Sequence, residues 1–539
     1  MQVVEKQGDR GIGTASRNAH HSVGFSAFLV SLGTLTSRIL GYFRDMLMAA
    51  MFSRFVTDAW IIAFRLPNMF RRIFGEGALS VSFIPVFVGL MKSGREDDAK
   101  KLAHGIFTLL LGVLIPLTVS GIIFPRWWVS LLVSSQEYGA IEGKMELTIE
   151  LSRIMFVYCL LVCIYAYYMA ILNGLRQFML AAFAPALWNV AMIAAIFWPG
   201  GQLAHAQAWG VVIGGIAQVA VLIPALLKQG YFPRVTFNFW TRDTLQVFRG
   251  LGPSLIGLGI LQVMMLANTR FASQLPQGSN SWIFWADRIL ELPLALFAVS
   301  LGTALLPTLS GLWAEGKLED FRKSSNYYLR SVLFLSFPSA LGIGLLSKPI
   351  VEVLFRRGYF SDDDAVQTAL VLKIYSIAVV VYSIIRVLAP CYYAMKNTWF
   401  PAVSSFIALI IHLTLAPIFM REWGLGGLIS SMIFSTTLNM IFLVLGAKHF
   451  FGGIGVRRIC QSLGRFSIGG AAIVAFSQAY EPILVVLTKL LGLPRLSEIL
   501  SLALVIFIAA LGYIGIMNWM GVEEFGPVQS RLKKYFRRS

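Results

Sequence analysis

Long apolar runs separated by short polar gaps dominate the chain from residue 24 to residue 519. A membrane-spanning helix needs about 20 apolar residues, and the runs reach that length. The alternating segments of about ten residues that are typical of a membrane β-barrel do not occur. The pattern predicts an all-α polytopic membrane protein with about 14 transmembrane helices. The expected spans are 24–52, 58–91, 104–134, 147–173, 178–199, 206–228, 246–273, 280–313, 328–356, 366–394, 399–420, 424–448, 460–480 and 496–519.

Composition supports this class of protein. Of the 539 residues, 57% are hydrophobic and 13% are charged, with a mean hydropathy of +0.71, whereas soluble domains carry about 25% charged residues. A net charge of +18 could suit a nucleic acid. In a membrane protein it is more typical of basic loops that face anionic lipid, so we expect no nucleic-acid partner. The four cysteines lie in or beside apolar segments and indicate no disulfide framework or metal site.

The charged loops set the expected orientation. Residues 1–23 form a polar tail without the apolar segment of a signal peptide, and residues 521–539 form a basic tail. With the N-terminus inside, most Lys and Arg of the loops are also inside, as the positive-inside rule requires. These inside loops include "KSGREDDAKK", "KQGYFPRVTFNFWTR" and "GKLEDFRKSSNYYLR". Both termini are therefore expected to be cytoplasmic.

An internal repeat relates two parts of the chain. The stretch "IPVFVGLMKSGREDDAKK" from Ile84 aligns without gaps with "LPTLSGLWAEGKLEDFRK" from Leu306. The copies are six spans apart, an even number, so both have the same orientation. Parallel repeats of this kind build transporters from two lobes. The repeat predicts lobes at 24–228 and 229–448 and an appended pair of helices within 449–520.

Charged residues interrupt the first span. The segment "SRILGYFRD" contains Arg38, Arg44 and Asp45. A charge at the bilayer centre costs about 2.5–3.5 kcal/mol on insertion scales, so intramembrane charges tend to mark function. Asp45 lies two turns from Arg38 on one helix face. It can neutralise one of the two arginines, while the other remains available for a ligand or extends to the membrane interface.

The second span has the densest charge. "RLPNMFRRIFGEG" contains Arg65, Arg71, Arg72 and Glu76, and Asp58 precedes it. Arg72 and Glu76 are separated by four residues and can pair within a helix. Arg71 has no obvious local partner, which favours a ligand. A proline at 67 and glycines at 75 and 77 make a straight helix here unexpected.

The eighth span, "WADRILELP", occupies the equivalent place in the second copy of the repeat. It contains Asp287, Arg288 and Glu291, and Arg288 can pair with Glu291 three residues later. The first span and these two related helices together carry a surplus of arginine. Arginine is suited to bidentate recognition of phosphate. The sequence therefore indicates an anionic substrate, most simply a phosphorylated one.

Three stretches resemble the MurJ (MviN) family of lipid II flippases in the MOP exporter superfamily. They are "SRILGYFRD", "TDAWIIAFRLPNMFRRIFGEGALSVSFIPVF" and "ADRILELPLALFAVSLGTALLPTLS". The resemblance implies two six-helix lobes around a central cationic cavity, with two C-terminal helices that form a groove for a polyprenyl tail. By motif, the family's important residues fall on Arg38, Arg44, Arg71, Arg288, Asp58 and Glu291. The remaining charges named above, including Asp287, would support or gate the site.

The resemblance also implies a substrate and a location, and it raises the question whether the protein binds sodium. The substrate is lipid II, an undecaprenyl-pyrophosphate-linked peptidoglycan precursor, moved to the outer leaflet of the bacterial cytoplasmic (inner) membrane. Some relatives have a sodium site with an aspartate on helix seven. This chain has Asn268 there and His412 near the expected partners. Sodium or the membrane potential could supply energy, and neither follows from the sequence. No other cofactor is expected.

The resulting hypothesis is a monomeric flippase, not an enzyme, that works by alternating access. One alternative is a flippase for another polyprenyl-pyrophosphate glycan, such as an O-antigen unit. A membrane glycosyltransferase would need acidic residues on a large external loop, and the external loops are short. A multidrug exporter for cations would need a pocket of the opposite charge.

Overall fold

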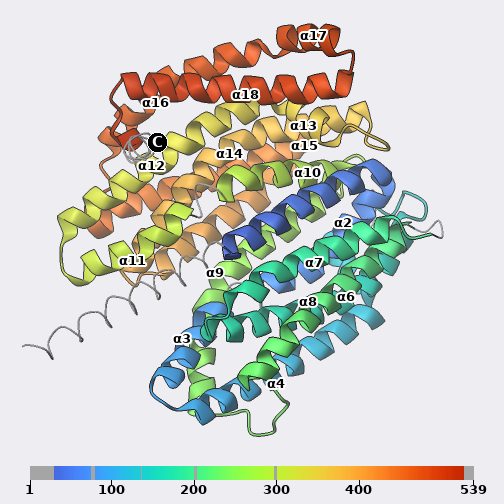
Figure 1. Ribbon diagram of the computed structural model, residues 1–539, viewed down its shortest axis with the longest axis vertical. Coiled ribbons are helices and arrows are strands. Elements are labelled where there is room, and N and C mark those ends of the chain that lie inside the picture. Colours follow the sequence, from blue (N-terminus) through green and yellow to red (C-terminus); the bar gives the residue numbers. More distant parts are fainter. Residues whose placement is uncertain (1–28, 74–78, 135, 200–202, 296–299, 527–539) are drawn as a thin grey trace, which may run out of the picture. The chain divides into compact units, whose positions relative to one another are not determined.

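The computed structural model describes residues 29–73, 79–134, 136–199, 203–295 and 300–526. Across these segments the chain forms helices and loops without a β-strand, which confirms the all-α prediction. The helices form two compact units (Figure 1). Unit 1 contains Met1–Leu132 and Gly139–Gly259, and unit 2 contains Val133–Tyr138 and Ile260–Ser539. The predicted tail of residues 1–23 and most of the basic tail of residues 521–539 lie outside the described residues.

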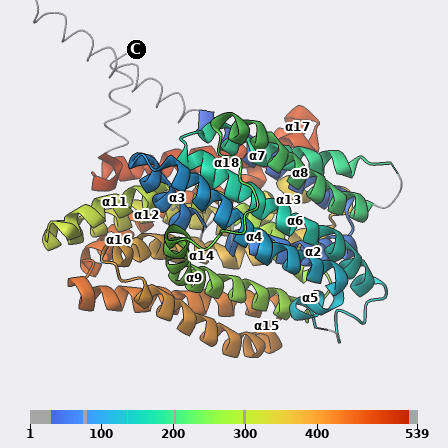
Figure 2. The ribbon, with the colours of Figure 1, turned by 90° about the horizontal axis from the view of Figure 1, so that it is seen from below.

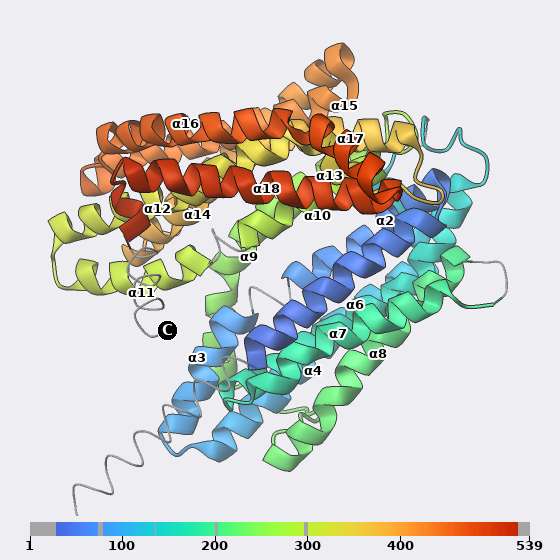
Figure 3. The same cartoon turned by 45° about the horizontal axis from the view of Figure 1, so that its top comes forward.

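Unit 1 begins with a helix over residues 29–51. Its other helices are α2 (Arg54–Phe70), α3 (Leu79–Lys92), α4 (Glu96–Ile123), α5 (Pro125–Leu132), α6 (Lys144–Gly174), α7 (Phe178–Ile196), α8 (Leu203–Gln229) and the first half of α9 (Arg242–Ala272). α7 and α8 run side by side (Figures 1 and 3). The repeat predicts a boundary after residue 228, but the units divide inside α9. The physical reason is packing, since Gly250 of α9 lies against Ser82 of α3.

An aromatic stack forms part of the core of unit 1. The ring of Phe64 on α2 lies 5.0 Å from Trp60, 5.9 Å from Tyr158 on α6 and 5.8 Å from Trp188 on α7. Ring separations of 4.5–7 Å add about 0.5–1.5 kcal/mol per pair beyond the burial of area. The stack therefore packs α2 against α6 and α7 immediately before Arg65.

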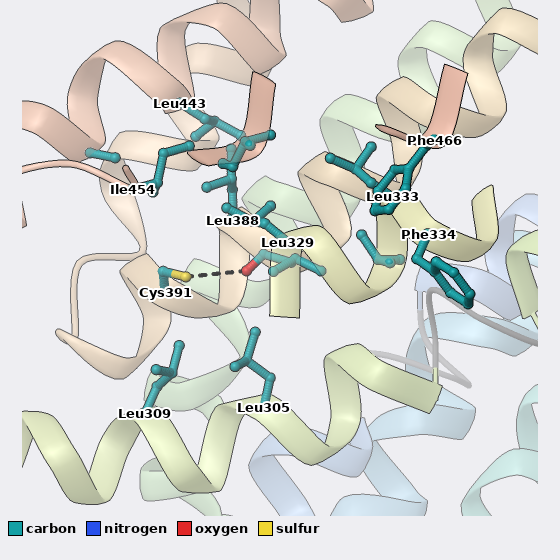
Figure 4. Packing of buried hydrophobic residues seen from close by; sticks show 14 of the residues in the cluster. Leu305, Leu309, Leu329, Leu333, Phe334, Leu388, Cys391, Leu443, Ile454 and Phe466 are labelled. Carbon is teal, nitrogen blue, oxygen red and sulfur yellow. Dashed lines mark hydrogen bonds between the residues drawn. The ribbon is translucent and has the colours of Figure 1, made fainter. Parts of the chain in front are cut away.

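Unit 2 contains the second half of α9 and nine further helices. They are α10 (Ser279–Pro293), α11 (Ser300–Ala314), α12 (Leu318–Leu345), α13 (Ser347–Phe355), α14 (Asp362–Ala394), α15 (Trp399–Phe451), α16 (Val456–Gln478), α17 (Tyr480–Leu491) and α18 (Pro494–Trp519), followed by the short 3₁₀ helix η3 (Glu523–Phe525). α11 lies beside α12 (Figure 2). In the core, Leu305 and Leu309 of α11 point toward Leu329 of α12, and the Cys391 thiol of α14 contacts Ser325 (Figure 4).

Ion pairs fasten the appended helices at both ends of α18. In its first turns, Glu498 binds Arg356, the residue after α13, at 2.7 Å. After it, Arg330 of α12 binds Glu523 and the buried Glu524, each at 2.9 Å. The hydrogen bond from Arg330 lowers the pKa of Glu523. Within unit 2, the helices that the resemblance assigns to a lipid-tail groove are thus joined by ion pairs to α12 and to the end of α13.

The backbone confirms the repeat. Gly94 and Gly316 occupy the same repeat position, and both have left-handed backbones, with φ of 72° and 70°. Each precedes a helix of 28 residues, α4 or α12. Arg176 after α6 and Lys396 after α14 are the non-glycine residues with positive φ in the described chain, both at 61°. Two copies that share such unusual backbone angles share a structure as well as a sequence pattern.

Four of the predicted spans each contain two helices. The ranges 58–91 and 280–313, each predicted as one bent span, contain α2 with α3 and α10 with α11. The ranges 104–134 and 328–356 contain α4 with α5 and α12 with α13. Short π-helical turns follow α2 and α10 at residues 71–73 and 294–295, next to the prolines inside these helices. In the described chain nine helices are long and apolar enough to cross a membrane. One of them, α15, is two helices joined at Gly424. The total of fourteen stays a prediction.

Candidate substrate-binding site

The arginines of the first helix have different surroundings. The Arg38 side chain is exposed and makes no hydrogen bond or ion pair with the described part of the chain. Arg44 is 4% exposed. It donates to Asp45 through Nε at 2.9 Å and Nη2 at 2.6 Å, and its guanidinium lies 4.8 Å from the ring of Trp188. Asp45 does neutralise one arginine, and it is Arg44.

Asn189 of α7 completes the surroundings of Arg44. Its Oδ1 accepts from Arg44 Nη1 at 2.9 Å, and its Nδ2 donates to the Ser37 carbonyl at 2.9 Å. Asn189 is buried and lies opposite Gly41, where a Cβ would be 3.7 Å from the amide nitrogen. Arg44 and Asn189 therefore fix the first helix on α7. Arg38, in contrast, is the arginine of this helix whose side chain is exposed.

Asp58 has a partner that the sequence did not suggest. Lys144, the first residue of α6, places Nζ 2.9 Å from Asp58 Oδ2, and both side chains are buried. A buried ion pair of this kind costs desolvation energy, and removal of one partner leaves an uncompensated charge. Asp58 consequently joins α2 to α6 inside unit 1. The role predicted for Asp58, to support or gate the site, stays a prediction.

The end of α2 carries the remaining charges of the second span. Arg71 donates through Nε to Asn68 Oδ1 at 3.0 Å, which corrects the expectation that it lacks a local partner. An asparagine three residues earlier on the helix supplies the bond. Arg65, Arg71 and Arg72 are half-buried. The predicted partner of Arg72, Glu76, lies outside the described residues, so this pairing stays a prediction.

In α10 the predicted local pair is present. Arg288 donates to Glu291 at 3.0 Å, three residues on, which confirms the pairing read from the sequence. The Arg288 guanidinium also lies 4.8 Å from the ring of Phe284, one turn before it. Both Arg288 and Asp287 are half-buried, while Glu291 is exposed. The pair is partly open to its surroundings, so the guanidinium retains accessible donors.

Asn268 and His412 meet in unit 2. His412 Nε2 and Asn268 Oδ1 are 2.8 Å apart, and Asn268 Nδ2 donates to the sulfur of Met432 at 3.1 Å. His412 Nδ1 lies 3.1 Å from the Ser431 hydroxyl. Sodium is a hard cation that prefers oxygen ligands, and the amide oxygen is already used. In the described chain no cluster of His, Cys, Asp or Glu could hold a metal ion. A sodium site in this chain stays a hypothesis.

The residues that sequence reasoning missed are Asn189, Lys144 and Asn68. Two of them are far from their partners in sequence: Asn189 is 145 residues from Arg44, and Lys144 is 86 residues from Asp58. Their positions depend on how helices pack. The available signal was weak: asparagines in membrane helices often form hydrogen bonds across helices, but the sequence does not name the partner.

Sequence comparisons identify the family. A family model described as the lipid II flippase MurJ matches residues 47–510. A relative named probable lipid II flippase MurJ, from Bdellovibrio bacteriovorus, is 44% identical over 508 residues, which is 94% of this chain and 96% of the relative. The chain belongs to the MurJ family. Its relatives are named flippases, and flippases are transporters rather than enzymes.

Solved structures support the MurJ fold. A structure titled lipid II flippase MurJ, inward closed conformation, matches with a TM-score of 0.75 and 22% identity, covering 92% of this chain and 98% of that one. An inward-facing MATE family multidrug transporter of the MOP superfamily matches with a TM-score of 0.67 and 15% identity, covering 81% and 99%. The MurJ fold is therefore shared with the wider MOP superfamily, and this chain is a multi-pass membrane protein.

Proposed function

We propose that this protein moves lipid II from the inner to the outer leaflet of the cytoplasmic membrane. The observation that carries the proposal is the match to the MurJ family over residues 47–510, together with a 44% identical relative named for that activity. The arginine-containing motifs of the first, second and eighth predicted spans lie in the same chain, and they suit a substrate with a pyrophosphate. Lipid II has such a group between its lipid and its sugars.

The proposed mechanism is alternating access with a cationic central cavity. Arginines bind the pyrophosphate while the polyprenyl tail stays in the bilayer, so that only the polar headgroup leaves water. Arg38 is the first candidate for direct contact because its side chain is exposed and has no partner in the described chain. Arg71 and Arg288, whose side chains are half-buried, are further candidates. Arg44 contributes by keeping the first helix on α7.

The membrane potential supports the same direction of movement. Transfer of one elementary charge across 100 mV is worth about 2.3 kcal/mol. The outside of a respiring bacterial cell is positive, so an anionic headgroup that moves outward gains this energy for each net charge. Asn268 stands where some relatives have an aspartate, and its Oδ1 contacts His412 Nε2, so we propose the potential rather than a sodium gradient as the energy source.

The decisive experiment follows the leaflet distribution of lipid II. In a depletion strain, rapid inactivation of this protein is expected to lower lipid II in the outer leaflet and raise it in the inner leaflet, measured with a membrane-impermeant enzyme that modifies the headgroup. An unchanged distribution would refute the proposal. If the outer-leaflet pool of another polyprenyl-pyrophosphate glycan fell instead, the alternative substrate would be correct.

Variants test the role of the arginines in the same assay. Arg38→Ala is expected to abolish or nearly abolish translocation at normal protein levels, and Arg38→Lys to retain part of it because lysine keeps the charge without the bidentate geometry. Arg71→Ala and Arg288→Ala are expected to reduce translocation. Arg421→Ala, an exposed arginine on α15, is the matched control. Normal translocation by Arg38→Ala would remove Arg38 from the proposed site.

A further inference from the structure

The loop of residues 231–241, which connects α8 to α9, is fixed to α4 although it has no regular structure (Figure 1). The backbone N–H of Arg234 donates to His104 Nδ1 and that of Thr236 to Thr108 Oγ1, each at 2.9 Å. Between them, Gly105 allows close approach, since a Cβ there would lie 3.1 Å from the carbonyl oxygen of Phe239. One turn of α4 therefore holds the loop through its backbone at three points.

Large apolar side chains of this fixed loop point away from the protein. Phe237 is 99% exposed, Val235 63% and Trp240 62%. A flexible loop could turn such side chains inward, but the backbone bonds to α4 prevent this here. Clustered exposed apolar groups on an ordered segment mark a surface that contacts something else. The cluster is a feature of unit 1 alone, because α4, α8 and residues 231–241 all belong to it.

α4 shows at which depth in the membrane the loop lies. Six of its first nine positions, from Glu96 to His104, are charged residues or histidine, and two of these are lysines. From Gly105 to Ile123 the helix has no charged residue. The change from charged to apolar sequence marks the boundary between headgroups and hydrocarbon. The loop is attached at His104, Gly105 and Thr108, which is where this change occurs.

The surroundings of the loop are basic. Four exposed cationic residues flank or belong to it: Lys228, Arg234, Arg242 and Arg249. The acidic residue in this segment, Asp243, lies 3.6 Å from Arg95. Three acidic residues, Glu96, Asp97 and Asp98, form the first turn of α4, and Asp98 pairs with Arg95 and Lys101. Aromatic side chains beside arginines are typical of segments that lie in the membrane interface, and anionic lipids attract the arginines.

We propose that residues 231–241 are an interfacial anchor that binds anionic phospholipid. Phe237 and Trp240 insert at the boundary between headgroups and acyl chains, and Arg234 and Arg242 bind the phosphates of neighbouring phospholipid headgroups. The occupant is a bilayer phospholipid and not the transported substrate, so the proposal is independent of the proposed function. The anchor fixes the connection between the two copies of the repeat at a defined depth in the membrane.

The depth of the loop can be measured directly. Phe237→Cys in a Cys460→Ser background, which removes the exposed native thiol, carries a nitroxide in phosphatidylglycerol-containing nanodiscs. We expect the label to collide with both oxygen and a water-soluble nickel reagent, as a label at the headgroup boundary does. Full accessibility to nickel with little to oxygen would place the loop in water. Protection from both would indicate a protein contact. Either result would overturn the proposal.

Headgroup binding is tested by thermal unfolding in nanodiscs of phosphatidylglycerol or phosphatidylcholine. Wild type is expected to unfold at a higher temperature in phosphatidylglycerol, and the double variant Arg234→Gln, Arg242→Gln to lose at least half of that difference. Arg421→Gln, a control in unit 2, is expected to keep it. The bonds to α4 come from backbone groups, so the substitutions leave them in place. No lipid-dependent difference in wild type, or an undiminished difference in the double variant, would contradict the proposal.

Discussion

The two units attach corresponding helices by different chemistry. In unit 1 the buried ion pair of Asp58 and Lys144 joins α2 to the start of α6. In unit 2 the indole N–H of Trp282 donates to Asp364 at 2.7 Å and joins α10 to the start of α14. The repeat offset of 222 residues, from Ile84 to Leu306, relates Trp282 to Trp60. Both units thus join the same pair of repeat-related helices, but through different positions and different chemistry.

The difference has an energetic meaning. In unit 1 both charges are buried, and each depends on the other for compensation. In unit 2 the carboxylate of Asp364 also accepts from the backbone and hydroxyl of Ser361 at 3.0 and 2.7 Å, in a capping box at the start of α14. The contact in unit 1 therefore rests on two buried opposite charges, and the contact in unit 2 on a carboxylate that accepts several hydrogen bonds.

The largest effect is expected for Asp58→Asn. The substitution keeps the shape of the side chain but removes the carboxylate charge 2.9 Å from the buried Lys144 ammonium; removal of one partner of a buried pair costs about 3–5 kcal/mol. Thermal unfolding in detergent should show a large loss of stability in this variant. Asp58→Leu combined with Lys144→Met should recover much of it, because an apolar pair removes both charges. Equal stability of Asp58→Asn and wild type would show that the pair is not a critical contact.

A smaller effect is expected for Trp282→Phe. The change removes one hydrogen bond to a carboxylate, worth about 1.5–3 kcal/mol, and Asp364 keeps its bonds to Ser361. The same unfolding measurement should place this variant between wild type and Asp58→Asn. Trp60→Phe in unit 1 is the control, since its indole nitrogen has no hydrogen-bond partner in the described chain. A loss in Trp282→Phe as large as that in Asp58→Asn would contradict the distinction between the units.

The smallest effect is expected where the two units are alike. Gly94→Ala and Gly316→Ala each place a side chain at positive φ, which costs about 1–2 kcal/mol. A Cβ at either position has no neighbour within 4 Å, so the backbone alone determines the cost. The two variants should lose equal stability in matched unfolding curves. Unequal losses would show that the loops after α3 and α11 have different roles despite their common geometry.

The sequence predicted those features that are local or repeated. Apolar run length predicts the helices, the repeat predicts the matching glycine turns, and spacing predicts the pair of Arg288 and Glu291. Partners across helices were not predictable, because residues 145 positions apart meet only through packing. Arg44 illustrates this: its motif indicated a ligand, whereas Asn189 and Trp188 surround it. Polar residues such as asparagine carry no periodic signal that would name their partner.

The two units form their ion pairs at different times during translation. Lys144 follows Asp58 by 86 residues, so unit 1 obtains its buried pair early in translation. Arg330 must wait for Glu523, 193 residues later. At about 5–20 residues per second, that interval is on the order of 10–40 s. During this time an arginine in a newly inserted helix lacks its carboxylates. Assembly of unit 2 is therefore complete only when the end of the chain has been made. A chain truncated before residue 523 would leave Arg330 without these two ion pairs.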